Sequence, residues 1–135
     1  MRHGRRGIAI LSAAAILMVI IPFAGLAVDA GILFVLQERL SAAVDAAAVA
    51  AARGVSAEVA SDTARRFFEA NFPAGYLGSK SESRDLQITL GNGQIQLAAT
   101  VKAPVYLLQL VRAEGPRLTA RARARLHFEA AAPVF

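Results

Sequence analysis

The sequence contains no cysteine and only two histidines, His3 and His127. The absence of cysteine excludes disulfide frameworks, thiolate zinc sites and cysteine nucleophiles together. Two histidines so far apart in sequence form no cluster that could hold a metal ion or run acid–base chemistry. These absences argue against an enzyme, and the sequence predicts no cofactor.

Sequence motifs for catalysis are also lacking. There is no Gly-x-Ser-x-Gly nucleophile elbow and no phosphate-binding P-loop. The Gly-Asn-Gly at residues 91–93 lacks the third glycine and the strand-to-helix context of a dinucleotide-binding loop. Glu58 and Asp62 share a helix face, but without a supporting histidine or second acidic cluster they are interpreted as a solvated surface.

Apolar residues dominate the composition: 56% of the 135 residues are hydrophobic and 19% are charged. The length has room for one modest domain, and the chain is too apolar to be disordered. Residues 7–28 carry no charge, and as a helix they would extend about 33 Å, enough to cross the hydrocarbon core of a bilayer. This run is longer than the apolar region of most secretory signals, which spans about 7 to 15 residues. The sequence therefore predicts an uncleaved transmembrane anchor.

The charges around this run predict its orientation. Arg2, Arg5 and Arg6 precede it, whereas Asp29 and Glu38 follow it. Basic flanks stay in the cytoplasm, so we expect a single pass through the membrane with the N-terminus inside and the C-terminal head outside the cytoplasm. The predicted parts are a cytoplasmic N-terminus (1–6), a transmembrane segment (7–28), an extended outer helix (29–53) and an α+β head (54–135).

The helical pattern continues beyond the membrane. Residues 30–53 contain no proline and are dominated by strong helix formers. Pro22 is expected to kink the resulting long helix, as a tolerated membrane kink rather than a working hinge, and Gly25 and Gly31 to loosen its backbone. Gly54 supplies the stop signal. Apolar residues recur at spacings of three and four along one seam: Leu33, Leu36, Leu40, Ala43, Ala47 and Ala50.

Asp29 has two interpretations. It can mark the outer membrane interface, which the count of flanking uncharged residues favours. If the bilayer is instead centred over residues 14–36, Asp29 is a buried carboxylate that needs a cationic or hydrogen-bonding partner, for example from an adjacent subunit.

A second helix is predicted from Ser56, as N-cap, to about Asn71, followed by an exposed loop over residues 73–84 that is rich in Pro, Gly and Ser. Arg65, Arg66 and Glu69 are expected on its solvent side. The opposite face gathers small and aromatic residues: Ala60, Thr63, Ala64, Phe67, Phe68 and Phe72.

Beyond the loop the hydrophobic period changes to two. Asn92-Gly93 predicts a two-residue hairpin turn, which pairs Leu90 with Ile95, Ile88 with Leu97 and Leu86 with Ala99 and places all six side chains on one face. A short helix of two turns is expected from Pro104 to about Val111, because proline favours a helix start.

The last predicted strand, from Arg117 to Phe128, alternates between an apolar and a basic face. Its small apolar side chains are expected to pack on the alanine-rich stretch from Ala42 to Ala52. The fold class is therefore a membrane-anchored α+β protein, with a long N-terminal transmembrane helix extended outward, a second helix, and a small antiparallel sheet of about three strands with a short helix.

Arg121, Arg123 and Arg125 lie on the basic face of this strand and could contact an anionic partner. Interleaved aromatic residues, which single-strand nucleic-acid binders use, are lacking, and the face lies outside the cytoplasm. Nucleic acid is therefore not predicted. A solvated face, or salt bridges to an acidic neighbouring subunit, is favoured.

Residues 5–52 resemble the N-terminal region of the TadE/TadG-like Flp pilus-assembly proteins of the bacterial tight-adherence (Tad) system. Four features carry the resemblance: the basic-Gly start (Arg6-Gly7), Pro22 within the apolar run, the element from Gly25 to Gly31, and the alanine-rich close from Leu40 to Ala52. Substrates of the prepilin peptidase in such systems usually carry glutamate at the fifth position after the cleaved glycine. Ser12 stands there if Gly7 is that glycine, so we expect no processing by this peptidase and a closer likeness to the TadG-like branch.

The resemblance implies a pilin-like structural component or assembly factor that serves cell adhesion. It also implies that the chain is anchored in the inner membrane, with the N-terminus inside and the C-terminal head periplasmic or extracellular. Its implied partners are the other Tad/Flp pilus subunits, the membrane platform proteins and the lipid bilayer, in a homo- or hetero-oligomer. The alternative is a membrane-tethered binding module whose arginine face holds an anionic ligand, such as a lipid head group or a cell-wall polymer.

Overall fold

A computed structural model describes residues 3–80, 85–110 and 115–126 of the chain. Arg2, Val111, His127 and Phe128, on which parts of the sequence predictions fall, lie outside these residues. The predicted fold class is confirmed: a long helix is followed by a second helix and a three-stranded antiparallel sheet. In chain order the elements are α1 (His3–Ala51), α2 (Ala57–Asn71), the 3-10 turn η1 (Tyr76–Gly78), β1 (Asp85–Gly91), β2 (Gln94–Lys102), the 3-10 turn η3 (Leu108–Leu110) and β3 (Arg117–Arg125).

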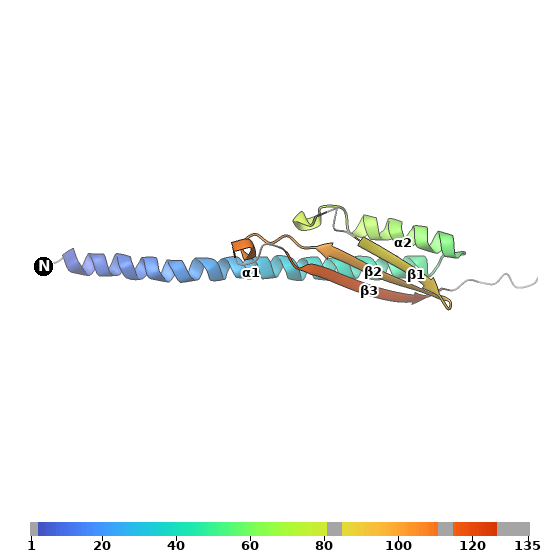
Figure 1. The fold of residues 1–135 in the computed structure, drawn as a ribbon, viewed down its shortest axis with the longest axis horizontal. Helices are drawn as coiled ribbons and strands as arrows, with labels where there is room; N and C mark the ends of the chain where they lie inside the picture. Colours follow the sequence, from blue (N-terminus) through green and yellow to red (C-terminus); the bar gives the residue numbers. More distant parts are fainter. Residues whose placement is uncertain (1–2, 81–84, 111–114, 127–135) are drawn as a thin grey trace, which may run out of the picture.

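Helix α1 is a single helix of 49 residues. It continues without interruption through Pro22, so the expected kink does not break it. Figure 1 shows α1 as one long rod whose N-terminal half stands alone, while every other element lies along its C-terminal half. The molecule thus consists of a bare helical stalk and a head built around the far half of the same helix.

Helix α2 returns along α1 after a tight turn. Ser56 is its N-cap, as predicted, and accepts a hydrogen bond from the backbone N–H of Val59 at 3.3 Å. Gly54 lies in the turn, where a Cβ atom would stand 2.9 Å from backbone atoms of Ala60. Glycine at this position and alanine at residue 60 therefore let the two helices approach closely.

The hairpin of β1 and β2 has the predicted register, with Leu90 opposite Ile95, Ile88 opposite Leu97 and Leu86 opposite Ala99. Asn92 and Gly93 both adopt positive φ values, 51° and 70°. A two-residue turn with this geometry matches the right-handed twist of the flanking strands, which explains why Asn-Gly fixes the pairing so well.

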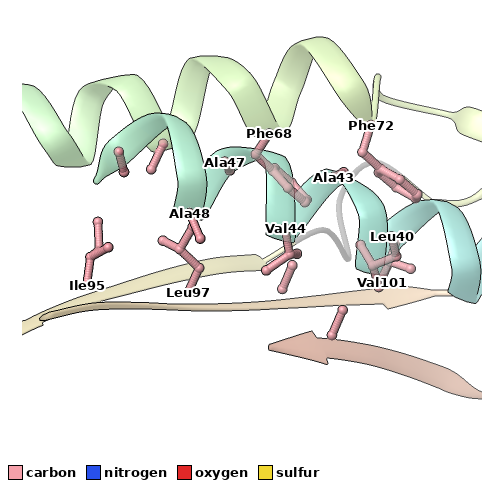
Figure 2. Packing of buried hydrophobic residues seen from close by; sticks show 14 of the residues in the cluster. Leu40, Ala43, Val44, Ala47, Ala48, Phe68, Phe72, Ile95, Leu97 and Val101 are labelled. Carbon is pink, nitrogen blue, oxygen red and sulfur yellow. The ribbon is translucent and has the colours of Figure 1, made fainter. Parts of the chain in front are cut away.

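Helix α1 is the central layer of the head. Figure 2 shows Phe68 and Phe72 of α2 pointing toward it from one side, and Leu97 and Val101 of β2 from the other. Because α1 is covered on two sides, its buried surface is wider than the seam predicted from sequence. Its fully or almost fully buried residues are Leu36, Leu40, Ala43, Val44, Ala47, Ala48 and Ala51.

Strand β3 completes the sheet beside β2 and contacts α1, as the alanine pattern predicted. Ala120 is buried, and the side-chain amide of Gln37 in α1 donates a hydrogen bond to the Thr119 carbonyl at 3.2 Å. Small side chains on β3 permit this close packing against the helix.

The segment after β2 differs from the prediction. Within the described residues, the expected two-turn helix from Pro104 is only the 3-10 turn Leu108–Leu110. Proline does favour a helix start. Here, however, contacts with α1 determine the path of residues 106–108.

Candidate functional site

The N-terminal half of α1 is a continuous apolar surface. Every residue from 4 to 24 is exposed, and Ile10, Met18 and Phe23 are 68–80% exposed. Among the described residues, α1 is the one helix long and apolar enough to cross a membrane. Arg5 and Arg6 lie at its start, ahead of this surface. Since no protein covers it, the surface suits lipid and not a water-facing position.

Ser12 is a polar residue within this surface. Its hydroxyl donates a hydrogen bond to the Ala9 carbonyl of the same helix at 3.0 Å. A hydroxyl that is paired in this way can lie in hydrocarbon without an unsatisfied polar group.

Asp29 joins the stalk to the head. Its side chain is 1% exposed, and its two carboxylate oxygens accept three hydrogen bonds from backbone N–H groups. The N–H of Tyr106 donates to Oδ1 at 3.3 Å, and those of Leu107 and Leu108 donate to Oδ2 at 2.9 and 2.8 Å. Hydrogen bonds from N–H groups to an ionised carboxylate are stronger than neutral ones, so this junction is a strong one.

Gly25 lies one turn before Asp29, on the same face of α1. The side chain of Leu107 packs directly on Gly25, and a Cβ atom there would clash with it. Gly25 and Asp29 thus form a two-point docking site on α1: the glycine admits the leucine side chain, and the carboxylate holds the backbone that carries it.

Among the residues of α1 that were identified from the sequence, Gly25 and Asp29 both contact residues 106–108. Pro22 and Gly31 are not part of this contact: Pro22 is exposed, and a Cβ atom at Gly31 would have no neighbour within 4 Å. The other half of the contact, residues 106–108, was missed by the sequence reasoning. The spacing of four between Gly25 and Asp29 was the available signal, because it places a gap and an acceptor on one helix face.

The arginine face lies on the side of the sheet that points away from α1. Arg121 and Arg123 line a depression of about 220 Å³, together with polar side chains of β1 and β2. Their neighbours in the depression include Gln87, Thr89 and Gln96. Arg125 lies at the end of the same strand. The guanidinium groups, the side-chain amides and the threonine hydroxyl around this depression can all donate hydrogen bonds to an anion.

A second, apolar groove of about 450 Å³ runs between the outer sides of α1 and α2. Val49 and Phe67, which are 57% and 48% exposed, line it, and Asp45 and Arg53 provide a charge of each sign. Exposed apolar side chains with opposite charges beside them suit a contact with another protein.

No group of three or more His, Asp or Glu side chains within the described residues is placed to hold a metal ion. The acidic pair considered in the sequence is explained by local contacts on α2. Asp62 forms an exposed ion pair with Arg66 at 3.0 Å, and Glu58 lies in the first turn of the helix. Both positions fit a solvated surface.

Comparison with known proteins gives one finding that bears on function. Residues 7–54 match the family described as putative Flp pilus-assembly TadE/G-like. The match confirms the resemblance inferred from the sequence over this segment, which comprises the apolar surface of α1, the docking site at Gly25 and Asp29, and the part of α1 that forms the centre of the head. No curated protein and no solved structure matches the chain.

Proposed function

We propose that this chain is a structural component or assembly factor of a Flp/Tad-type pilus, similar to a minor pilin or pseudopilin, and that it is anchored in the inner membrane. The observation that carries the proposal is the family match over residues 7–54, which coincides with the lipid-compatible stalk and its continuation into the head. The match supports a role related to pilus assembly; the position in the inner membrane and the pilin-like role are the proposal. On this reading the chain performs no catalysis.

In the proposed arrangement residues 7–28 cross the membrane once. Arg2, Arg5 and Arg6 hold the N-terminus in the cytoplasm, because translocating basic residues is unfavourable. The outer part of α1 then forms the centre of the head. The groove between α1 and α2 lies on the surface of the head and offers a contact for another pilus subunit or a membrane platform protein.

Cysteine labelling tests this orientation directly, because the native chain has no cysteine. We expect Thr89→Cys, an exposed site on the sheet, to react with a membrane-impermeant maleimide before the inner membrane is lysed. His3→Cys, at the other end of α1, should react only after lysis. The reverse pattern would contradict the topology. Co-purification of the full-length protein with other Tad components tests the role, and recovery of the protein alone from pilus-forming cells would count against it.

The depression beneath Arg121 and Arg123 favours one alternative function. We propose as this second candidate that the arginine face holds a phosphate-bearing or similarly anionic ligand, such as a lipid head group or a cell-wall polymer. The support is the convergence of two guanidinium groups with Gln87, Thr89 and Gln96 around one depression. In the first proposal the same arginines are a solvated face or contact an acidic neighbouring subunit.

Charge reversal separates the two candidates. If the face binds an anion, Arg121→Glu combined with Arg123→Glu should abolish retention of the detergent-solubilised protein on immobilised polyphosphate, while pilus assembly continues. Arg65→Glu, at an exposed arginine on α2, is the control and should retain most of the binding. Unchanged retention in the double variant would overturn the binding-module candidate.

A further inference from the structure

Residues Tyr106 to Leu110, here called the foot, form an exposed projection of the head that is apolar except for Gln109. Leu110 is 84% exposed and Tyr106 is 61% exposed, and Leu107 covers Gly25 with part of its side chain and exposes the remainder. Figure 1 shows η3, in orange, as the part of the head nearest to the bare half of α1. Large apolar side chains are therefore gathered at the end of the head that faces the stalk.

The foot contacts α1 inside its lipid-compatible part. Gly25, on which Leu107 packs, belongs to the uncharged run of residues 7–28. The exposed apolar surface of α1 continues past this point to Phe34 and Val35, which are 70% and 46% exposed. Between Arg6 and Glu38 the one charged residue is Asp29, and its carboxylate is buried beneath the foot. Among the described residues, the part of α1 around the foot therefore exposes no charged side chain.

Four of the five backbone N–H groups of the foot donate hydrogen bonds within the chain, which suits a surrounding without water. The N–H groups of Tyr106, Leu107 and Leu108 donate to Asp29, and that of Leu110 donates to the Leu107 carbonyl at 3.1 Å. A turn in water needs no such arrangement, because water satisfies its N–H groups. In hydrocarbon each unpaired N–H costs several kcal/mol, and irregular backbone is tolerated there only when its polar groups are satisfied.

From these observations we infer that the foot inserts into the outer leaflet of the bilayer beside α1, so that the head contacts the membrane at a second point. The inference rests on the proposed membrane anchor. Leu107 and Leu110 supply the inserted apolar side chains. Tyr106 suits the boundary between acyl chains and head groups, since its ring is exposed while its hydroxyl lies next to Gly78 of the head.

Insertion of the foot has a mechanical consequence. A head attached by one helix alone could tilt in any direction together with that helix. With the foot in the leaflet, one side of the head always faces the bilayer, and the arginine face and the groove between α1 and α2 keep fixed directions relative to the membrane. The presentation of these surfaces to neighbouring subunits is thereby set by this chain itself.

Tryptophan fluorescence in vesicles tests the inference, because the chain contains no tryptophan. The full-length protein is reconstituted in vesicles of phosphatidylcholine and phosphatidylglycerol, with part of the lipid brominated either near the head group or near the chain end. Leu110→Trp reports on the foot, and Ile16→Trp reports on the middle of the span. Val55→Trp is the matched control: Val55 is 82% exposed, like Leu110, but lies at the opposite end of the head, about 40 Å along α1.

We expect Leu110→Trp to lose emission with lipid brominated near the head group and to emit at shorter wavelength than Val55→Trp, which should be unaffected by either lipid. Ile16→Trp should be quenched most by lipid brominated near the chain end. If Ile16→Trp is quenched while Leu110→Trp behaves like Val55→Trp, the foot lies outside the bilayer and the inference is overturned, whether water or another protein covers it. If Ile16→Trp is not quenched, the membrane anchor itself fails and the inference fails with it.

Discussion

Asp29→Ala is expected to weaken the junction between the stalk and the head by about 3 kcal/mol, because it leaves three backbone N–H groups without their acceptor. Hydrogen exchange of the full-length protein in vesicles should detect this as a roughly hundredfold faster exchange of the Tyr106, Leu107 and Leu108 amides. Amides in the centre of the sheet, such as that of Ala99, should exchange at their original rate, because their bonds to neighbouring strands are unchanged.

Two variants make this result specific. Asp45→Ala removes the same side chain from an exposed position of the same helix and should leave the foot amides unaffected. Asp29→Asn keeps the size and one acceptor oxygen but turns an NH₂ group toward donors, so its effect should be intermediate. If Asp29→Ala and Asp45→Ala exchange alike at residues 106–108, the carboxylate does not hold the foot.

The parts of the fold that follow from local chemistry could be predicted from the sequence. The hairpin register follows from the Asn92-Gly93 turn and the alternation on both sides of it, which together allow one pairing. Ser56 was identifiable as an N-cap, because a serine before a helical apolar pattern satisfies the first N–H groups of the helix. Neither inference needs to know where any distant residue lies.

The partner of Asp29 could not be predicted in the same way. Its hydrogen bonds reach 77 to 79 residues along the chain, and they are made to backbone groups, which leave no mark in the sequence. The sequence left two interpretations open: an interface position, which was favoured, and a buried carboxylate with a cationic or hydrogen-bonding partner. The structure shows the second, in which the carboxylate is buried and its hydrogen-bond donors come from the same chain and not from an adjacent subunit.

The helix expected from Pro104 was wrong, and the difference has a physical explanation. Proline at residue 104 is compatible with a helix start, but the three bonds from residues 106–108 to Asp29 point their N–H groups at one carboxylate, which a regular two-turn helix would not require. Pro22 lies within the uninterrupted helix α1, and the expected kink at this residue stays a prediction. The residue lies on the exposed stalk, where its ring meets no neighbouring element.

The large side chains of α2 matter for the core of the head, because four of the seven buried hydrophobic residues of α1 are alanine. Phe68 is 1% exposed and stacks on Phe72 with ring centroids 5.9 Å apart. The Phe68 ring points from α2 toward the part of α1 between Ala47 and Ala43, and the Phe72 ring points toward α1 near Leu40 (Figure 2). The alanines on α1 leave space that these rings fill, so the removal of one ring cannot be compensated from the opposite side.

Phe68→Ala is therefore expected to lower the free energy of unfolding of the head by about 3 to 5 kcal/mol. Phe67→Ala is the matched control, since it removes the same ring from the neighbouring position of the same helix, where the side chain is 48% exposed; its cost should be about 1 kcal/mol. Urea unfolding of the full-length protein in detergent, followed by far-ultraviolet circular dichroism, measures both. Equal losses in the two variants would mean that α2 is not held on α1 by Phe68, and that the stalk helix does not serve as the central layer of the head.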